Sequence, residues 1–190
     1  MRLFLAVTLP DDVRESIGRA TAEVRATVTG VRWVRPELLH LTVKFLGERA
    51  DGDERRLEGA LRSPLVRVPG CEATIRGAGA FPNFRRPRVV WLGMHPVAPL
   101  AGIARRVDDA LTPLGIEGER RPFRAHVTLG RVNEGFPATQ GEALERALRA
   151  VGVAWDLRVA DVAVMRSTLG RGGPTYDVLA RIPLGSPGAS

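Results

Sequence analysis

Two short segments of this 190-residue chain share one pattern, a histidine followed two residues later by a threonine inside an apolar, β-branched run. The first segment begins at His40 and the second at His126, so that nearly half the chain separates them. Residues i and i+2 of a strand lie on the same face. We therefore expect each segment to present an imidazole beside a hydroxyl, from Thr42 in one segment and from Thr128 in the other.

The spacing of the two segments indicates how the chain is divided. We expect two pseudo-symmetric lobes with antiparallel sheets, each giving one of these strands to a central cleft, with helices on the outside. The irregular alternation of strand-like and helical segments is typical of an α+β domain. We expect one domain over residues 1–184 and a flexible tail over residues 185–190, which contain only Gly, Ser, Pro and Ala.

Periodicity and turn residues give the expected elements. Strands are expected at residues 2–9, 31–34, 38–46, 71–76, 88–92, 123–129, 155–166 and 175–182. Apolar residues at helical spacing predict helices from Asp11 to Gly30 and from Leu100 to Gly115, and a short charged helix over residues 53–62. Residues 139–142 match a capping box for a fourth helix, and residues 170–173 predict a hairpin turn.

Several classes of protein are excluded by composition. No apolar run approaches the ~20 residues that a membrane span requires, and the apolar start of the chain ends too early for a signal peptide. We therefore expect a cytoplasmic protein. Cys71 is the only cysteine, which excludes an internal disulfide and a zinc ribbon and favours a structural thiol.

The net charge of +7 is compatible with a polyanionic partner such as RNA. The basic residues are scattered and all but one are arginine; the exception is Lys44. In an ideal strand Lys44 shares the face of His40 and Thr42, and the alternative is a solvated surface lysine. The third histidine, His95, is expected in a surface loop. No cluster of residues has the spacing of metal ligands, so we expect neither a metal nor a cofactor.

The surroundings of the two motifs add a family resemblance. Residues 33–48 and 121–131 resemble the paired signatures of the two-histidine phosphoesterase superfamily, and most closely its RNA 2′,3′-cyclic phosphodiesterases, long called 2′–5′ RNA ligases. Residues 2–10, 89–93 and 165–169, followed by Gly173 and Tyr176, match further parts of that pattern in order. Ala125 stands where the family often has proline, which leaves the backbone before His126 less restrained. Gly130 stands where a small residue is usual.

The resemblance implies metal-independent hydrolysis of RNA 2′,3′-cyclic phosphate ends to 2′-phosphomonoesters. It assigns His40 as the proton donor and His126 as the proton acceptor, and histidine suits both roles because its pKa lies near neutrality. Thr42 and Thr128 would bind phosphate oxygens. From the residues alone, the roles of the two histidines can be exchanged.

Two further residues are candidates for substrate contact. Arg131 lies five residues after His126, so an ideal strand points it away from the cleft. It can bind substrate only if the strand ends or bulges near Gly130. Phe4 has two interpretations, stacking on a base or packing in the core, and the second is expected.

Other functions remain open at this stage. The same site run in reverse is a 2′–5′ RNA ligase, and histidines that only contact phosphate would make a non-catalytic RNA-binding module. A nuclease that trims longer 3′ tails and a phosphodiesterase for another cyclic nucleotide are also compatible with the motifs. The expected partners are RNA with 2′,3′-cyclic phosphate ends or small cyclic nucleotides. We expect a monomer without membrane contact.

Overall fold

The computed structural model describes residues 1–186 and is built around one large sheet. Its strands are β1 (Arg2–Thr8), β2 (Val31–Trp33), β3 (His40–Glu48), β4 (Cys71–Phe81), β5 (Val89–His95), β6 (His126–Val132), β7 (Trp155–Val159), β8 (Asp161–Gly170) and β9 (Gly173–Pro183). The helices are α1 (Asp11–Ala20), α2 (Ala22–Thr27), α3 (Asp53–Leu65), α4 (Val97–Leu111) and α5 (Ala138–Ala150), with short 3-10 turns at Pro36–Leu38 and Thr112–Leu114.

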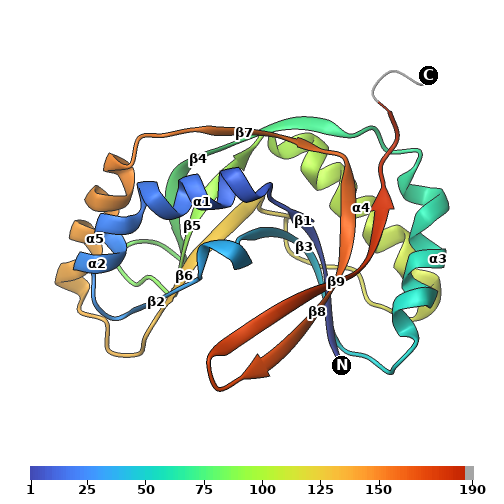
Figure 1. Cartoon of the computed structure of the whole chain (residues 1–190), viewed down its shortest axis with the longest axis horizontal. Coiled ribbons are helices and arrows are strands. Elements are labelled where there is room, and N and C mark those ends of the chain that lie inside the picture. Colours follow the sequence, from blue (N-terminus) through green and yellow to red (C-terminus); the bar gives the residue numbers. More distant parts are fainter. Residues whose placement is uncertain (187–190) are drawn as a thin grey trace.

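The nine strands follow the order β7-β4-β5-β6-β3-β1-β8-β9, and β2 pairs with β6 beside this path. All pairings between these strands are antiparallel. The expected α+β class with antiparallel strands is therefore confirmed. The β8–β9 hairpin projects from the body of the molecule (Figure 1), and its turn lies at the predicted residues 170–173.

The two halves of the sheet exchange helices. Helix α1 follows β1 in the chain, yet the hydroxyl of Ser16 in α1 accepts a hydrogen bond from the indole N–H of Trp155 in β7. Helix α4 follows β5 but packs against α3 and β3. Figure 1 shows the result, with α2 and α5 at one end of the molecule and α3 at the other. This exchange interlocks the halves that carry the two histidines.

Several expected elements differ from the structure only in their bounds, such as the strand expected at residues 123–129 and found at His126–Val132, and three differ in more than that. The first helix is interrupted at Thr21, whose buried hydroxyl donates to the Ile17 carbonyl, an arrangement that competes with regular helix. The strand expected at residues 155–166 is two strands, β7 and β8, because the chain leaves one side of the sheet at Ala160 for the other. The capping box is wrong, because α5 begins after Pro137 and has no side-chain cap.

Gly185 does not behave as the start of a free tail. Its N–H donates to the Val68 carbonyl and its carbonyl accepts from Gly70, and Gly185 bridges Pro69. Gly185 is therefore held against the residues before β4, and residues 187–190 of the expected tail lie outside the described part.

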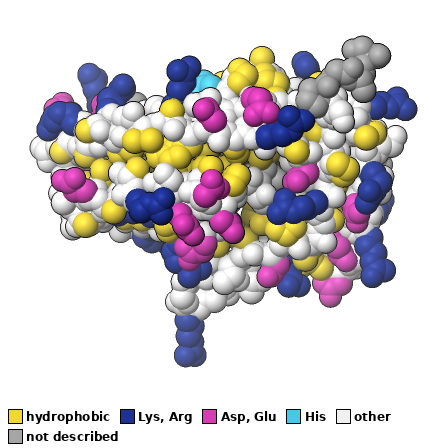
Figure 2. All heavy atoms as spheres, turned by 45° about the horizontal axis from the view of Figure 1, so that its top comes forward, with side chains coloured by type: hydrophobic (Ala, Val, Ile, Leu, Met, Phe, Trp, Pro, Cys, Tyr) yellow, Lys and Arg dark blue, Asp and Glu magenta, His cyan; other side chains and the backbone are white. Residues whose placement is uncertain are grey.

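Two further features bear on the expected partners: the distribution of charge on the surface and the apolar character of the helices. Acidic and basic side chains are interspersed on the face shown in Figure 2, as the scattered arginines predict. No helix within residues 1–186 has the length and apolar character that crossing a bilayer requires.

Candidate active site

The two histidine motifs meet where β3 and β6 lie side by side. Leu41 pairs with Val127, and both side chains are buried in the core. Because neighbouring residues of a strand point to opposite faces, the flanking histidines and threonines share the other face. The antiparallel register places His40 across from Thr128 and Thr42 across from His126. The structure therefore brings the four predicted groups together on one open face of the sheet.

Both imidazoles are oriented by the backbone in the same way. The Nδ1 atom of His40 lies 2.8 Å from the Leu38 carbonyl oxygen, and that of His126 lies 2.6 Å from the Arg124 carbonyl oxygen. A carbonyl can only accept, so Nδ1 is the donor in each ring and Nε2 is left for chemistry. The Nε2 atom of His40 lies 3.0 Å from the hydroxyl oxygen of Thr42.

Aromatic rings surround His40. The ring of Phe4 lies 5.0 Å from the imidazole, and the ring of Tyr176 stands edge-on at 5.3 Å. Phe4 is 4% exposed, so it packs beneath the imidazole, which confirms the expectation of core packing. Tyr176 belongs to the family pattern in the sequence, but its contact with His40 depends on the β8–β9 hairpin.

A second pair of rings holds His126. Phe81 stands edge-on at 4.9 Å and Trp91 lies at 6.1 Å. The Trp91 ring covers Gly79 on the paired strand, where an added Cβ would come within 2.2 Å of the indole. Sequence reasoning gave Phe81 no role, and only the pairing of β4 with β5 connects this glycine to the tryptophan.

Burial lowers the pKa of both histidines below the ordinary value of 6.5. For His40, desolvation is the main cause and the charge of His126 adds to it, whereas the Leu38 carbonyl acts in the opposite direction. For His126, desolvation is again first, the Arg124 carbonyl opposes it, and the positive charge of Arg131 lowers the pKa further. The surroundings therefore favour the neutral form of each imidazole before substrate binds.

Arg131 reaches the site because β6 carries a bulge. Val90 pairs with Gly130 and Trp91 with Thr128, so Leu129 is an extra residue between them. A bulge reverses the alternation of the residues that follow it. Arg131 can bind substrate only if the strand ends or bulges near Gly130, and this bulge meets that condition. Burial raises the pKa of the Tyr176 hydroxyl, and the exposed guanidinium of Arg131 partly opposes that rise, while the same charge adds to the lowering of the His126 pKa by burial.

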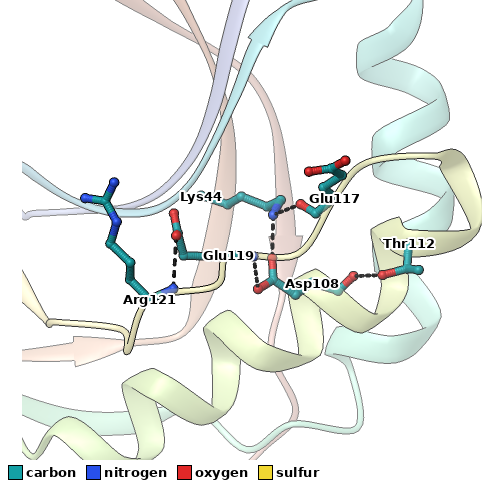
Figure 3. Close-up of polar contacts among 6 residues, drawn as sticks. All are labelled: Lys44, Asp108, Thr112, Glu117, Glu119 and Arg121. Atoms are coloured by element: carbon teal, nitrogen blue, oxygen red, sulfur yellow. Dashed lines mark hydrogen bonds and ion pairs between the residues drawn. The ribbon is translucent and has the colours of Figure 1, made fainter.

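Lys44 does not share the face of His40, and this expectation is wrong. A bulge at Val43 shifts the β1–β3 register and turns Lys44 toward α4. There its ammonium lies 2.5 Å from a carboxylate oxygen of Asp108 and 2.7 Å from the Glu117 carbonyl oxygen (Figure 3). The second carboxylate oxygen of Asp108 accepts from the Glu119 N–H. This cluster holds the loop that leads to His126.

His95 and Cys71 complete the titratable groups singled out in the sequence. His95 is the last residue of β5, paired with Thr74, and not part of a loop as expected. Burial, and then the charge of Glu72, raise the pKa of the Cys71 thiol, which keeps it protonated. Within residues 1–186 no three His, Cys, Asp or Glu side chains are grouped as metal ligands.

Relatives of known activity match nearly the whole chain. A protein of Methanothermobacter thermautotrophicus is 36% identical over 176 residues, which cover 93% of this chain and 95% of the relative. An Escherichia coli protein is 33% identical, with coverage of 95% and 94%. Both relatives are named RNA 2′,3′-cyclic phosphodiesterase.

Solved structures agree with this likeness. A structure from Thermus thermophilus has a TM-score of 0.78 and 29% identity and covers 98% of this chain and 100% of its own. Escherichia coli LigT complexed with 3′-AMP has a TM-score of 0.76 and 31% identity, with coverage of 96% and 97%.

The family model described as LigT like phosphoesterase matches residues 7–91 and residues 93–176. Each matched segment contains one of the two histidine motifs, in agreement with the pseudo-symmetry expected from their spacing. Together with the relatives above, this match shows that the chain belongs to the LigT-like phosphoesterase family.

Proposed function

We propose that this chain hydrolyses RNA 2′,3′-cyclic phosphate ends to 2′-phosphomonoesters without a metal ion. The observation that carries the proposal is the matched pair of imidazoles on one face of the sheet, each with Nδ1 held by a backbone carbonyl and Nε2 left for chemistry, and with Nε2 of His40 beside the Thr42 hydroxyl. Two such groups can take one proton and give another across a bound phosphate. The relatives named RNA 2′,3′-cyclic phosphodiesterase support the same reaction.

The reaction needs one histidine neutral and the other protonated. Nε2 of His126 takes a proton from water as the water oxygen bonds to phosphorus. The bond from phosphorus to the ribose 3′ oxygen then breaks, and His40 gives its proton to that oxygen. Both pKa values are low in the free protein, but the charge of Arg131 disfavours protonation of His126 in particular, which supports its assignment as the base.

The remaining polar groups serve the phosphate. The hydroxyls of Thr42 and Thr128 donate to its non-bridging oxygens and stabilise the charge that develops there. The guanidinium of Arg131 adds a positive charge on the His126 side. We assign substrate binding to these three residues and proton transfer to His40 and His126.

The test is the opening of a 2′,3′-cyclic mononucleotide by folded variants. His40→Ala and His126→Ala should each lower kcat by about 10²–10⁴, because each removes one proton-transfer group. Thr42→Val and Thr128→Val should lower it less, and Thr27→Val on the exposed surface of α2 serves as their matched control. Near-normal turnover by either histidine variant contradicts the assignment.

Product analysis separates this function from its alternatives. A hydrolase yields the 2′-phosphomonoester, a ligase joins the end to a second RNA, and a binding module leaves the cyclic phosphate intact. Excess EDTA should leave the rate unchanged, and a chelated sample restored by Mg²⁺, Mn²⁺ or Zn²⁺ would refute the metal-independent mechanism.

We further infer that residues 1–184 act as one catalytic domain in a cytoplasmic monomer. One chain supplies both histidines and both threonines, so no second copy is needed to complete the site. Size-exclusion chromatography with light scattering tests this inference, and activity that appears only in a dimeric fraction would overturn it.

A further inference from the structure

A hollow opens on the sheet beside the active site. It has a volume of about 440 Å³ and is lined by Thr74, Arg76, His95, Pro96 and Val97. These residues come from β4, the end of β5 and the start of α4. In the sheet order, β5 and β4 follow β6 on the side away from β3. The hollow therefore lies beyond His126, on the side opposite to His40.

Strand pairing places this hollow on the catalytic face of the sheet. Arg76 pairs with Gly93, and Gly93 pairs with His126. Directly paired residues of neighbouring strands point to the same side, while Leu92 and Met94 are buried on the other. The side chain of Arg76 is thus on the face of His126.

At Gly93 the path between the two sites is bordered by the His95 imidazole and not by a side chain of residue 93. Gly93 stands between Arg76 and His126 and presents no side chain. An added Cβ would lie 3.0 Å from Nε2 of His95, which shows that this imidazole lies against the glycine. Neighbouring strands are about 4.8 Å apart, so the backbone of Arg76 lies about 10 Å from that of His126. A flexible arginine at that distance can contact the next phosphate along a bound strand.

The groups around the hollow favour an anion. Arg76 is exposed and takes part in none of the ion pairs found within residues 1–186. Its planar guanidinium suits a phosphate. Val97 begins α4, whose first amides lack a side-chain cap and carry the positive end of the helix dipole.

One carboxylate opposes this preference. Asp156 accepts a hydrogen bond from the Thr74 hydroxyl at 2.6 Å. The hydroxyl is therefore occupied, and the carboxylate is close enough to repel a second negative charge. Arg76 and the positive end of α4 together carry more charge than this one carboxylate opposes, so the balance of charge around the hollow still favours a phosphodiester anion.

We propose that this hollow binds the phosphodiester on the 5′ side of the terminal nucleotide, with Arg76 and His95 as its donors. This inference rests on the proposed function and extends it, because it makes the protein select RNA ends over free cyclic mononucleotides. It gives a substrate-binding role to His95, a residue for which the sequence alone indicates none.

The experiment compares two dinucleotides that end in a 2′,3′-cyclic phosphate. One has an ordinary internal phosphodiester and the other an uncharged methylphosphonate, each diastereomer being assayed separately. The wild-type protein should favour the charged linkage in kcat/KM by roughly three- to tenfold, the range expected for a partly exposed charge pair. Arg76→Gln should bring this ratio close to one, and His95→Gln should reduce it.

A cyclic mononucleotide and an unrelated arginine provide the controls. Arg76→Gln should open the mononucleotide at the wild-type rate, because that substrate lacks the second phosphate. Arg105→Gln, on the exposed side of α4, should retain the full wild-type ratio.

The outcomes distinguish this inference from the function on which it rests. A wild-type ratio near one, or a ratio that persists in Arg76→Gln, overturns the subsite while all substrates are still opened. Failure of the wild-type protein to open any of the three substrates overturns the proposed function and the subsite together.

Discussion

The buried cluster of Lys44 and Asp108 predicts an unequal response to the loss of its two partners. The Lys44 side chain is 7% exposed and that of Asp108 is 22% exposed. Asp108→Ala leaves a buried ammonium with only the Glu117 carbonyl as acceptor. Removing one partner of a buried pair costs about 3–5 kcal/mol. We expect a loss near the lower end of that range, because water can enter where the carboxylate was.

Lys44→Met should cost less. Methionine keeps most of the apolar stem in place, and the remaining Asp108 carboxylate still accepts from the Glu119 N–H and reaches water. We expect a loss of about 1–2 kcal/mol, mainly from the Glu117 carbonyl that loses its donor. Against a typical unfolding free energy of about 5–15 kcal/mol, both variants remain folded.

Urea unfolding followed by circular dichroism measures the difference, with the midpoints compared at equal m values. The double variant Lys44→Met/Asp108→Ala should be more stable than Asp108→Ala alone, because it removes the orphaned charge. The reasoning is refuted if Lys44→Met is as destabilising as Asp108→Ala, or if the double variant is the sum of the two single variants.

Three further predictions concern the histidines and their support. The pH profile of kcat/KM should be a bell centred below pH 6.5, because burial lowers both histidine pKa values in the free protein. A bell centred above pH 6.5 would contradict the lowering of these pKa values. Because both histidine pKa values are lower in the folded protein than in the unfolded chain, the unfolded chain binds more protons as the pH falls towards and below 6.5. The free energy of unfolding should therefore decrease from about pH 7.5 to about pH 5. The double variant His40→Gln/His126→Gln should show a smaller decrease in its urea midpoint over the same range. Gly79→Ala should displace Trp91, cost about 1–3 kcal/mol and lower kcat, whereas Gly172→Ala, with free space around it, should change neither quantity measurably.

Local pattern predicts the strands that carry the site. The two histidine motifs, the amphipathic helices and the β8–β9 turn follow from periodicity and turn residues, which act over a few positions. The pattern also places Leu41 and Val127 opposite to the catalytic face, where the structure buries them. These predictions are confirmed because one face of each strand must be covered by the core.

Pairing between distant strands determines where bulges occur and on which face the following residues lie, and local sequence pattern does not contain this information. The bulges at Val43 and Leu129 arise from the register with β1 and β5, and each reverses the face of the residues that follow. Sequence reasoning therefore assigns Lys44 to the wrong face and leaves the role of Arg131 conditional. It also places His95 in a loop, because the extension of β5 to residue 95 depends on its partner strand β4.

The carbonyl contacts of the two imidazoles have a consequence for how such a site tolerates change. Each histidine takes its orientation from the residue two positions earlier and, in the first motif, contacts the threonine two positions later. The orientation of each ring is thus set first within one five-residue unit, and aromatic rings from other strands then pack against it. The rest of the chain must also set the distance between the two units. Strands β3 and β6 fix that distance through a single residue pair, Leu41 and Val127. Helices and loops that contact neither ring can therefore change without moving the two proton-transfer groups, whereas the β8–β9 hairpin is constrained because it carries Tyr176 against His40.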